Sequence, residues 1–245
     1  MELKHANTAP SKINRGISLI IYADPGIGKT TLATTLPEGE TLIINTEAGL
    51  GPLLGTKHVV FDVGAALVDK NLEEVMSELY QVIRTGQFKV KNVVIDNISH
   101  LIGQLTIHYT ESRTKEFPEL KEYGDTAYKM MEWIHNWNDL RDMGINVVFN
   151  AWEYAYDLQN NNGTIITKTG PLVGKSSVGK ICGIVDLVGH MEVFEKTGAR
   201  WVRFQPSQQY ITKCQFKGLD PKGEEPNLTK IIDKLKAYDY SKESK

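Results

Sequence analysis

Apolar and polar positions along the chain form a regular series of strand-like and helix-like segments. Short continuous apolar runs, typical of buried strands in parallel sheets, occupy residues 17–22, 41–45, 93–95 and 145–149. Apolar residues recur at helical spacing after Asn71 and over 126–142, and residues 29–36 can form a further helix. This alternation predicts an α/β fold with a mostly parallel central sheet flanked by helices.

The last hundred residues follow a different pattern. Residues 188–195 and 200–205, separated by a turn-prone K-T-G-A, predict an antiparallel hairpin. A further strand is expected over 210–216 and a closing helix over 228–238. We therefore expect antiparallel strands toward the C-terminus. The predicted organisation is an N-terminal arm, a core and a C-terminal helix with a tail, with bounds at 1–16, 17–220 and 221–245.

Composition narrows the class of protein. The 245 residues carry 28 Lys and Arg against 30 Asp and Glu, a net charge of −2, and 41% are hydrophobic. These values exclude intrinsic disorder and extensive electrostatic coating of DNA, so any contact with nucleic acid needs a local basic patch. Cys182 and Cys214 are too few for a disulfide scaffold. No apolar run reaches the ~18–20 residues of a membrane span, and no signal peptide is visible, so we expect a cytoplasmic protein without a membrane partner.

The first apolar run leads into a segment with the spacing of a phosphate-binding P-loop. Its sequence is A-D-P-G-I-G-K-T, with Ala23 at the first glycine position. Gly26 and Gly28 let the backbone bend so that N–H groups face phosphate oxygens. Lys29 can reach the β- and γ-phosphates of ATP, and the Thr30 hydroxyl can bind Mg²⁺. The predicted nucleotide-binding residues are Asp24, Pro25, Gly26, Ile27, Gly28, Lys29, Thr30 and Thr31.

Acidic and amide side chains follow the other predicted strands. Asp96 ends K-N-V-V-I-D and is expected to join Thr30 in holding Mg²⁺. Glu47 follows T-L-I-I-N and is a candidate base for activating the attacking water, with Glu153 as its rival. Asn150, at the end of I-N-V-V-F-N, is a candidate sensor of the γ-phosphate.

The order of these motifs resembles the core of the RecA-type recombinase ATPases. The compact size, G-P-L-V-G-K and I-V-D-L-V-G-H resemble the phage-encoded RecA-like proteins, often labelled phage nucleotide-binding or single-strand annealing proteins. The resemblance covers about residues 15–220 and implies a RecA-like fold. It also implies that Glu47 is the catalytic glutamate, that Asp96 is the metal-side acid and that Asn150 is the sensor. Lys29 of the P-loop is expected to be catalytic as well.

The resemblance further implies two DNA-binding loops and a contact between subunits. The loops would lie at about 111–125 and 153–180. The family has a late K-x-K pair that reaches the neighbouring ATP site, of which Lys213 matches only the first lysine and Lys217 is a possible substitute.

Basic residues favour the second of these loops. Residues 158–185 contain Lys168, Lys175, Lys180 and no acid, whereas 111–125 has five acids and is better interpreted as solvated surface. The equally weighted alternative for the second segment is a β-hairpin around 160–163 whose aromatic residues pack into the core.

Three functions are compatible with these features. The favoured one is an ATP-hydrolysing recombination protein that oligomerises or forms a filament, binds single-stranded DNA and promotes annealing or strand pairing in the cytoplasm, which for a phage-encoded protein is that of the host. The alternative is a nucleotide-gated protein that switches partners, such as a single-stranded-DNA-binding protein. A small-molecule kinase is disfavoured because the arginines are scattered and form no lid.

Overall fold

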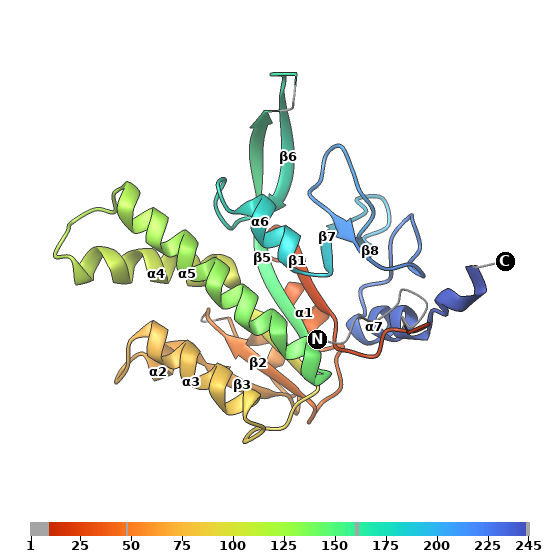
Figure 1. Ribbon diagram of the computed structural model, residues 1–245, viewed down its shortest axis with the longest axis horizontal. Coiled ribbons are helices and arrows are strands. Elements are labelled where there is room, and N and C mark those ends of the chain that lie inside the picture. The colour runs from red at the N-terminus through yellow and green to blue at the C-terminus, as the bar shows by residue number, and fades with distance from the viewer. Residues whose placement is uncertain (1–9, 48, 160–161, 244–245) are drawn as a thin grey trace, which may run out of the picture.

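A nine-stranded sheet forms the centre of the computed structural model, which describes residues 10–47, 49–159 and 162–243 (Figure 1). Its strands are β1 (Ser18–Ala23), β2 (Thr41–Asn45), β3 (Val59–Asp62), β4 (Asn92–Asp96), β5 (Asn146–Gln159), β6 (Ile165–Pro171), β7 (Leu187–Val193), β8 (Arg200–Arg203) and β9 (Lys213–Cys214). The main order is β3-β2-β4-β5-β1-β7-β8, with β6 paired to β5 and β9 to β7. Pairs from β3 to β7 are parallel, and β6, β8 and β9 pair antiparallel. The predicted α/β fold is confirmed.

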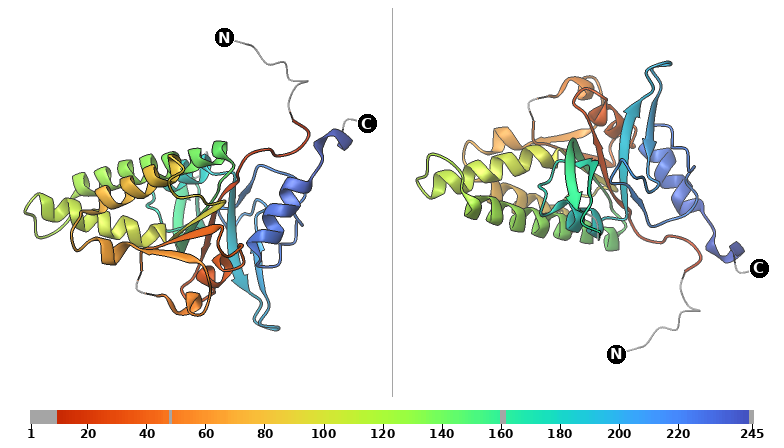
Figure 2. Two further views of the ribbon diagram at one scale, coloured as in Figure 1. Left: turned by 90° about the horizontal axis from the view of Figure 1, so that it is seen from below. Right: turned by 90° about the horizontal axis from the view of Figure 1, so that it is seen from above.

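Helices cover both faces of this sheet. They are α1 (Lys29–Ala33), α2 (Val63–Ala66), α3 (Leu72–Arg84), α4 (Ile98–Ser112), α5 (Leu120–Asp139), α6 (Val178–Ile184) and α7 (Leu228–Ala237), with 3₁₀ turns at Gly51–Leu53, Leu140–Met143 and Tyr240–Glu243. Figure 2 shows α3, α4 and α5 on one side of the sheet and α7 on the other. The α4–α5 hairpin and the β5–β6 hairpin extend away from the body of the molecule (Figure 1).

Alternate residues of each buried strand pack into two separate hydrophobic cores, one on each face of the sheet. In β1, Ile20 and Tyr22 pack in the core formed with α3, α4 and α5. Leu19 and Ile21 pack in the opposite core, which contains Leu32 of α1 and the apolar face of α7. The strands are therefore apolar on both faces, which explains why their sequences are continuous apolar runs.

Several predicted elements differ from the observed ones in length. The bounds of β2 match the predicted strand, and the Asn71–Glu74 capping box predicted for α3 is present. The predicted helix over 29–36 ends earlier, and the predicted strand over 210–216 forms only the two residues of β9. The expected loop at 111–125 is wrong for most of its length, because α4 extends into it and α5 begins within it. Apolar contacts between these two long helices stabilise the hairpin.

A buried carboxylate ties several elements together at the amino end of the sheet. Asp186, whose side chain is 1% exposed, accepts hydrogen bonds from Arg15 at 2.8 and 3.1 Å and from Arg141 at 2.6 Å. It also accepts the Ser18 amide at 3.0 Å, so the segment before β1, the start of β1 and the turn after α5 meet at one group. Among the described residues, no helix is long and apolar enough to cross a membrane.

Candidate active site

The strand order brings the carboxyl ends of β1, β5, β4 and β2 side by side. In the register of the sheet, Asn150 of β5 pairs with Asp96 of β4, and Asp96 pairs with Asn45, two residues before Glu47. On the other side of β5, Trp152 pairs with Ala23, where the P-loop begins. The polar residues that the sequence places after separate strands therefore meet at a single edge, as expected for parallel strands.

The P-loop has the backbone shape that its glycines predict. Gly26 and Gly28 have φ angles of +81° and +109°, in the region that disfavours other residues. The buried Lys29 folds back over the loop, and its ammonium donates hydrogen bonds to the carbonyls of Ala23 at 2.9 Å and Asp24 at 3.0 Å. The loop thus connects β1 to α1 with the lysine held inside it.

Asp96 lies directly beside the P-loop. The side chains of Thr30 and Asn150 both lie close to its carboxylate and lower its pKa. Burial has the larger effect, so the pKa of Asp96 is raised above its ordinary value. The peptide bond between Asp96 and Asn97 is cis. Asp96 and the P-loop threonine therefore lie close together, and their joint role in holding Mg²⁺ stays a prediction.

Glu47 is held at the same edge by contacts between the ends of β2 and β4. The Thr46 hydroxyl donates to the Asn97 carbonyl at 3.0 Å and accepts the Asn97 amide at 2.8 Å. The Asn97 side-chain amide donates to the Glu47 carboxylate. Burial raises the pKa of Glu47, and the nearby Asp96 raises it further. A carboxylate with a raised pKa is suited to accept a proton near neutral pH.

Sequence reasoning overlooked Asn97, although a second polar residue directly after the strand-ending Asp96 was a visible signal. Asn97 also caps α4, its side-chain oxygen accepting the His100 amide at 2.8 Å. One side chain therefore orients the predicted base and begins a helix.

The residues at this edge fit a nucleotide with Mg²⁺. Burial lowers the pKa of Lys29, while the carboxylates of Asp96 and Glu47 favour its charged form. The Asn150 side-chain nitrogen is buried and has no hydrogen-bond partner among the described residues, so it is a donor available to a ligand. The hydroxyl of Thr30 and the carboxylate of Asp96 are hard oxygen ligands of the kind that Mg²⁺ prefers.

Glu153 lies near the same lysine but is bonded elsewhere. Its carboxylate is 3.0 Å from Nε2 of His190 in β7, and the His190 ring stacks on Tyr210 with centroids 4.0 Å apart. Because the rival base is engaged by a buried histidine, the geometry favours Glu47 for the role of base. No local sequence pattern identified His190, because its contact with Glu153 depends on β5 and β7 pairing on opposite sides of β1.

The segment predicted to bind DNA forms a hairpin and a helix. β5 and β6 pair from Glu153–Pro171 to Gln159–Ile165, which agrees with the hairpin alternative. Tyr156 is 1% exposed and packs in the core, whereas Tyr154 is 52% exposed. The predicted turn position at 160–161 lies outside the described residues. The expected long loop over 153–180 is therefore wrong, because strand pairing orders most of it.

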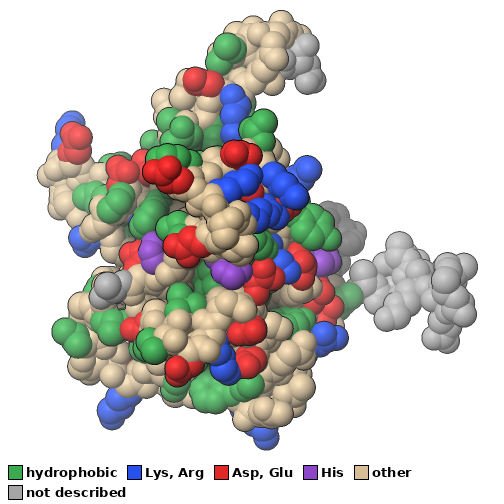
Figure 3. Space-filling model, turned by 90° about the vertical axis from the view of Figure 1, so that its left-hand side faces the viewer, with side chains coloured by type: hydrophobic (Ala, Val, Ile, Leu, Met, Phe, Trp, Pro, Cys, Tyr) green, Lys and Arg blue, Asp and Glu red, His purple; other side chains and the backbone are tan. Residues whose placement is uncertain are grey.

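The basic side chains of this segment differ in their freedom. Lys168 is half-buried and donates to the Ser207 carbonyl at 3.0 Å. Lys175 and Lys180 are exposed at and near the start of α6. On the α4–α5 side of the molecule, Figure 3 shows acidic and basic side chains intermixed around one basic cluster. Most residues of 111–125 are exposed, and Arg113 and Lys115 form ion pairs with Glu122, which agrees with a solvated surface at 111–125.

The two lysines expected to act between subunits lie in different surroundings. The ammonium of Lys213 donates to the carbonyls of Gly183 at 2.7 Å, Val185 at 2.7 Å and Cys182 at 3.3 Å. These bonds use its three donors to hold the end of α6, so Lys213 is not free to reach another subunit in this conformation. Lys217 is exposed, and its backbone amide donates to the Tyr240 hydroxyl at 3.0 Å.

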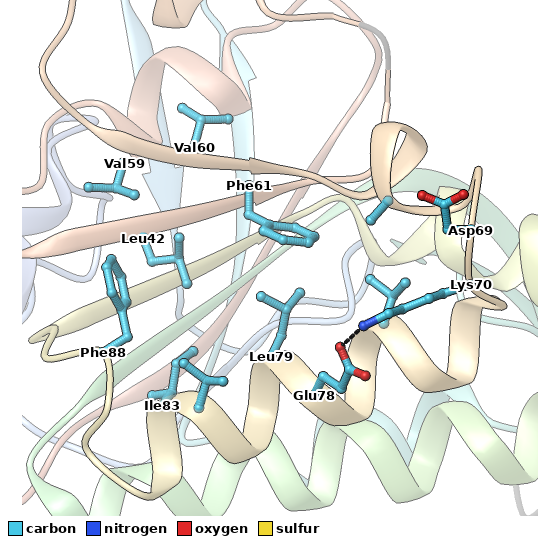
Figure 4. Close-up of a pocket in the computed structure, with 13 residues that line it drawn as sticks. Leu42, Val59, Val60, Phe61, Asp69, Lys70, Glu78, Leu79, Ile83 and Phe88 are labelled. Atoms are coloured by element: carbon cyan, nitrogen blue, oxygen red, sulfur yellow. Dashed lines mark hydrogen bonds and ion pairs between the residues drawn. The ribbon is translucent and has the colours of Figure 1, made fainter.

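An apolar cavity of about 510 Å³ lies apart from the P-loop, between β3 and α3 (Figure 4). Phe61, Leu79 and Ile83 point into it, and an ion pair between Lys70 and Glu78 lies at its rim. The cavity lacks the residues of the P-loop edge, so it does not form part of the candidate active site.

Comparisons with known proteins identify the family of this chain. No match to the sequence was found among curated proteins. The structure is similar to that of the flagellar accessory protein FlaH from Methanocaldococcus jannaschii, with 12% identity and a TM-score of 0.42 over 86% of this chain and 90% of that one. The model of a family described as an AAA domain matches residues 15–216, which include the P-loop, Glu47, Asp96 and Asn150. The chain therefore belongs to the AAA domain family, and its fold and family support nucleotide binding and ATPase activity.

Proposed function

We propose that this chain is an ATPase of DNA recombination that assembles into an oligomer or filament on single-stranded DNA and promotes annealing or strand pairing. The observation that supports the proposal most is the continuity of β5. This strand carries Asn150 at the nucleotide edge and then continues without a break into the projecting β5–β6 hairpin. A change in the contacts of Asn150 would therefore act directly on the segment that bears Lys168.

The proposed hydrolysis assigns one role to each group at the edge. Gly26, Gly28 and Lys29 bind the phosphates, and Thr30 and Asp96 would hold Mg²⁺, which neutralises phosphate charge when bound. The Glu47 carboxylate accepts a proton from the water that attacks the γ-phosphate, and the Asn97 amide keeps that carboxylate in place. The Asn150 amide supplies a hydrogen bond to the γ-phosphate or to the water.

The proposed contact with DNA rests on charge and stacking. Lys175 and Lys180 are exposed in a segment without acidic residues, and both can contact backbone phosphates. The exposed ring of Tyr154 on the hairpin is available to stack on a base. These features predict binding of single strands that weakens as salt is added.

The test is the ATPase rate with and without single-stranded DNA across a salt series. We expect stimulation by DNA that fades with salt. A Lys175→Ala, Lys180→Ala double variant should reduce the slope of log affinity against log salt by about 1.4, since each phosphate contact on single strands contributes about 0.7. Lys121→Ala, on the solvated α5 surface, is the matched control and should leave the slope unchanged. An ATPase rate of the wild-type chain that is the same with and without single-stranded DNA would contradict the proposal.

One observation favours the alternative of a nucleotide-gated protein that switches partners. Ile166 is 39% exposed and, in the register of β5 and β6, lies on the same face of the hairpin as the exposed Tyr154, which gives that face an apolar surface suited to a protein. A partner such as a single-stranded-DNA-binding protein would then replace DNA at this hairpin. An ATPase rate that responds to the protein partner and not to bare DNA would support this alternative.

A further inference from the structure

Arg200, the first residue of β8, reaches across to the P-loop. Its Nε donates a hydrogen bond to the carbonyl of Ile27 at 2.8 Å. Its stem lies against Gly28: a Cβ on that glycine would be 3.9 Å from the Arg200 Cδ and 3.8 Å from the Met191 Cε. The β7–β8 hairpin, which is far from the P-loop in sequence, therefore covers one flank of the loop.

Within itself the loop has few hydrogen bonds that fix this part of the backbone. The Ile27 amide is 3.5 Å from the Asp24 carbonyl, a long hydrogen bond. Glycines with positive φ stand on both sides of Ile27, and glycine backbones rotate at low cost. The peptide between Ile27 and Gly28 would thus be free to rotate if nothing outside the loop held it.

The bond to Arg200 fixes the direction of that peptide. The Ile27 carbonyl and the Gly28 amide belong to one planar trans unit, so they point in opposite directions. Because the carbonyl is held toward the hairpin, the Gly28 N–H points away from the hairpin.

We propose that Arg200 is a positioning residue of the P-loop, which aims the Gly28 N–H at the β-phosphate of a bound nucleotide. This inference rests on the proposed nucleotide-binding function. The planar guanidinium suits the role, because its Nε lies close to the stem that packs on Gly28 while its terminal nitrogens extend beyond the contact. Its positive charge also adds to that of Lys29 at the rim of the site.

The test compares three variants by calorimetric titration with ATP, ADP and AMP. Arg200→Met keeps an unbranched stem without donors, and Arg200→Lys keeps the charge without Nε. We expect both variants to lower the affinity for ATP and for ADP by about fivefold to tenfold, the effect of one hydrogen bond. The affinity for AMP should stay unchanged because AMP lacks the β-phosphate. In turnover assays KM should rise with kcat nearly unchanged, since the contact exists before and during reaction.

Lys196→Met is the matched control, because Lys196 is an exposed cation in the turn of the same hairpin, and its affinities should equal those of the wild type. Thermal unfolding without nucleotide identifies any variant that fails to fold, and Arg200→Lys then replaces Arg200→Met. Wild-type affinity in both Arg200 variants, or in Arg200→Lys alone, would overturn the inference while the proposed function stands. A wild-type chain that binds neither ATP nor ADP would overturn both.

Discussion

Glu47 and Glu153 both lie close enough to Lys29 to favour the charged form of its ammonium. Their surroundings distinguish them. Glu47 is oriented by the Asn97 amide beside Asp96, whereas Glu153 is bonded to a buried histidine. A general base needs a free lone pair directed at the attacking water, and Glu47 meets this condition better.

Glu47→Gln should therefore keep ATP binding and lose turnover, by at least about 100-fold, because glutamine cannot accept the proton. Glu153→Gln is the matched control and should keep most of the rate. Single-turnover hydrolysis together with ATP titration measures both effects. Normal turnover in Glu47→Gln with loss in Glu153→Gln would assign the base to Glu153.

The pH profile of kcat gives a further check on Glu47. The base acts only when ionised, and burial raises the pKa of Glu47 above its ordinary value of 4.5. On the acid side of the profile, the kcat of the wild type should therefore fall at a higher pH than it would if the base were an exposed glutamate. The residual activity of Glu47→Gln should show no such limb.

Asp186 predicts a pH-dependent contribution to stability. Burial alone would raise its pKa, but hydrogen bonds from Arg15 and Arg141 outweigh this and lower it. The pKa of Asp186 in the folded state is therefore below the unfolded value of 3.8. The stabilisation of the folded state by Asp186 is complete above pH 3.8 and is lost as the pH falls through the folded pKa. Asp186→Asn should lower the free energy of unfolding by about 3 kcal/mol at neutral pH. Denaturant titrations should show that the difference in unfolding free energy between the wild type and Asp186→Asn becomes smaller below the unfolded pKa. A difference that does not change with pH would contradict this account.

At the scale of elements, strand β5 of the β5–β6 hairpin carries one buried tyrosine, Tyr156, and one exposed tyrosine, Tyr154. The Tyr156 hydroxyl donates to the Pro171 carbonyl at 2.8 Å and accepts the Val173 amide at 3.1 Å, while Tyr154 is exposed. Tyr156→Phe leaves both backbone groups unpaired and should cost about 1–3 kcal/mol of unfolding free energy. Tyr154→Ala should barely change stability but weaken binding of single-stranded DNA. Equal effects of the two variants on unfolding would contradict this division.

The sequence predicted the strands better than the segments between them. Continuous apolar runs identify β1, β2 and β4 because these strands are buried on both faces. β3 was missed because it is the edge strand and its residues are partly exposed. The loop at 111–125 was misplaced because charged positions mask the helical spacing at the start of α5, where Glu122 forms an ion pair with Arg113.

At the scale of the whole molecule, the candidate site joins parts of the chain that are distant in sequence. The P-loop belongs to β1 and α1, Asp96 to β4 and Asn150 to β5. A nucleotide bound there would contact the folded state alone. At 100 times its dissociation constant, ATP should raise the free energy of unfolding by about 2.7 kcal/mol. Lys29→Ala should abolish this shift in thermal denaturation; a shift retained in that variant would place the nucleotide elsewhere.

The candidate site could be predicted only as far as its residues follow strands. The positions of Glu47, Asp96 and Asn150 after apolar runs were sufficient to place them at one edge. Arg200 and His190 could not be assigned in this way, because their contacts depend on how the β7–β8 hairpin and β5 pack beside β1. Such long-range pairings have no local sequence pattern.

The folded-back position of Lys29 has a consequence for how affinities are interpreted. Its ammonium already has two partners, the carbonyls of Ala23 and Asp24, before any ligand arrives. Phosphate oxygens must take the place of these carbonyls, so binding exchanges one set of hydrogen bonds for another. The affinity lost in Lys29→Ala therefore measures the difference between two sets of bonds. The two loop carbonyls therefore compete with the phosphate oxygens for Lys29 and raise the nucleotide concentration that is needed to fill the site.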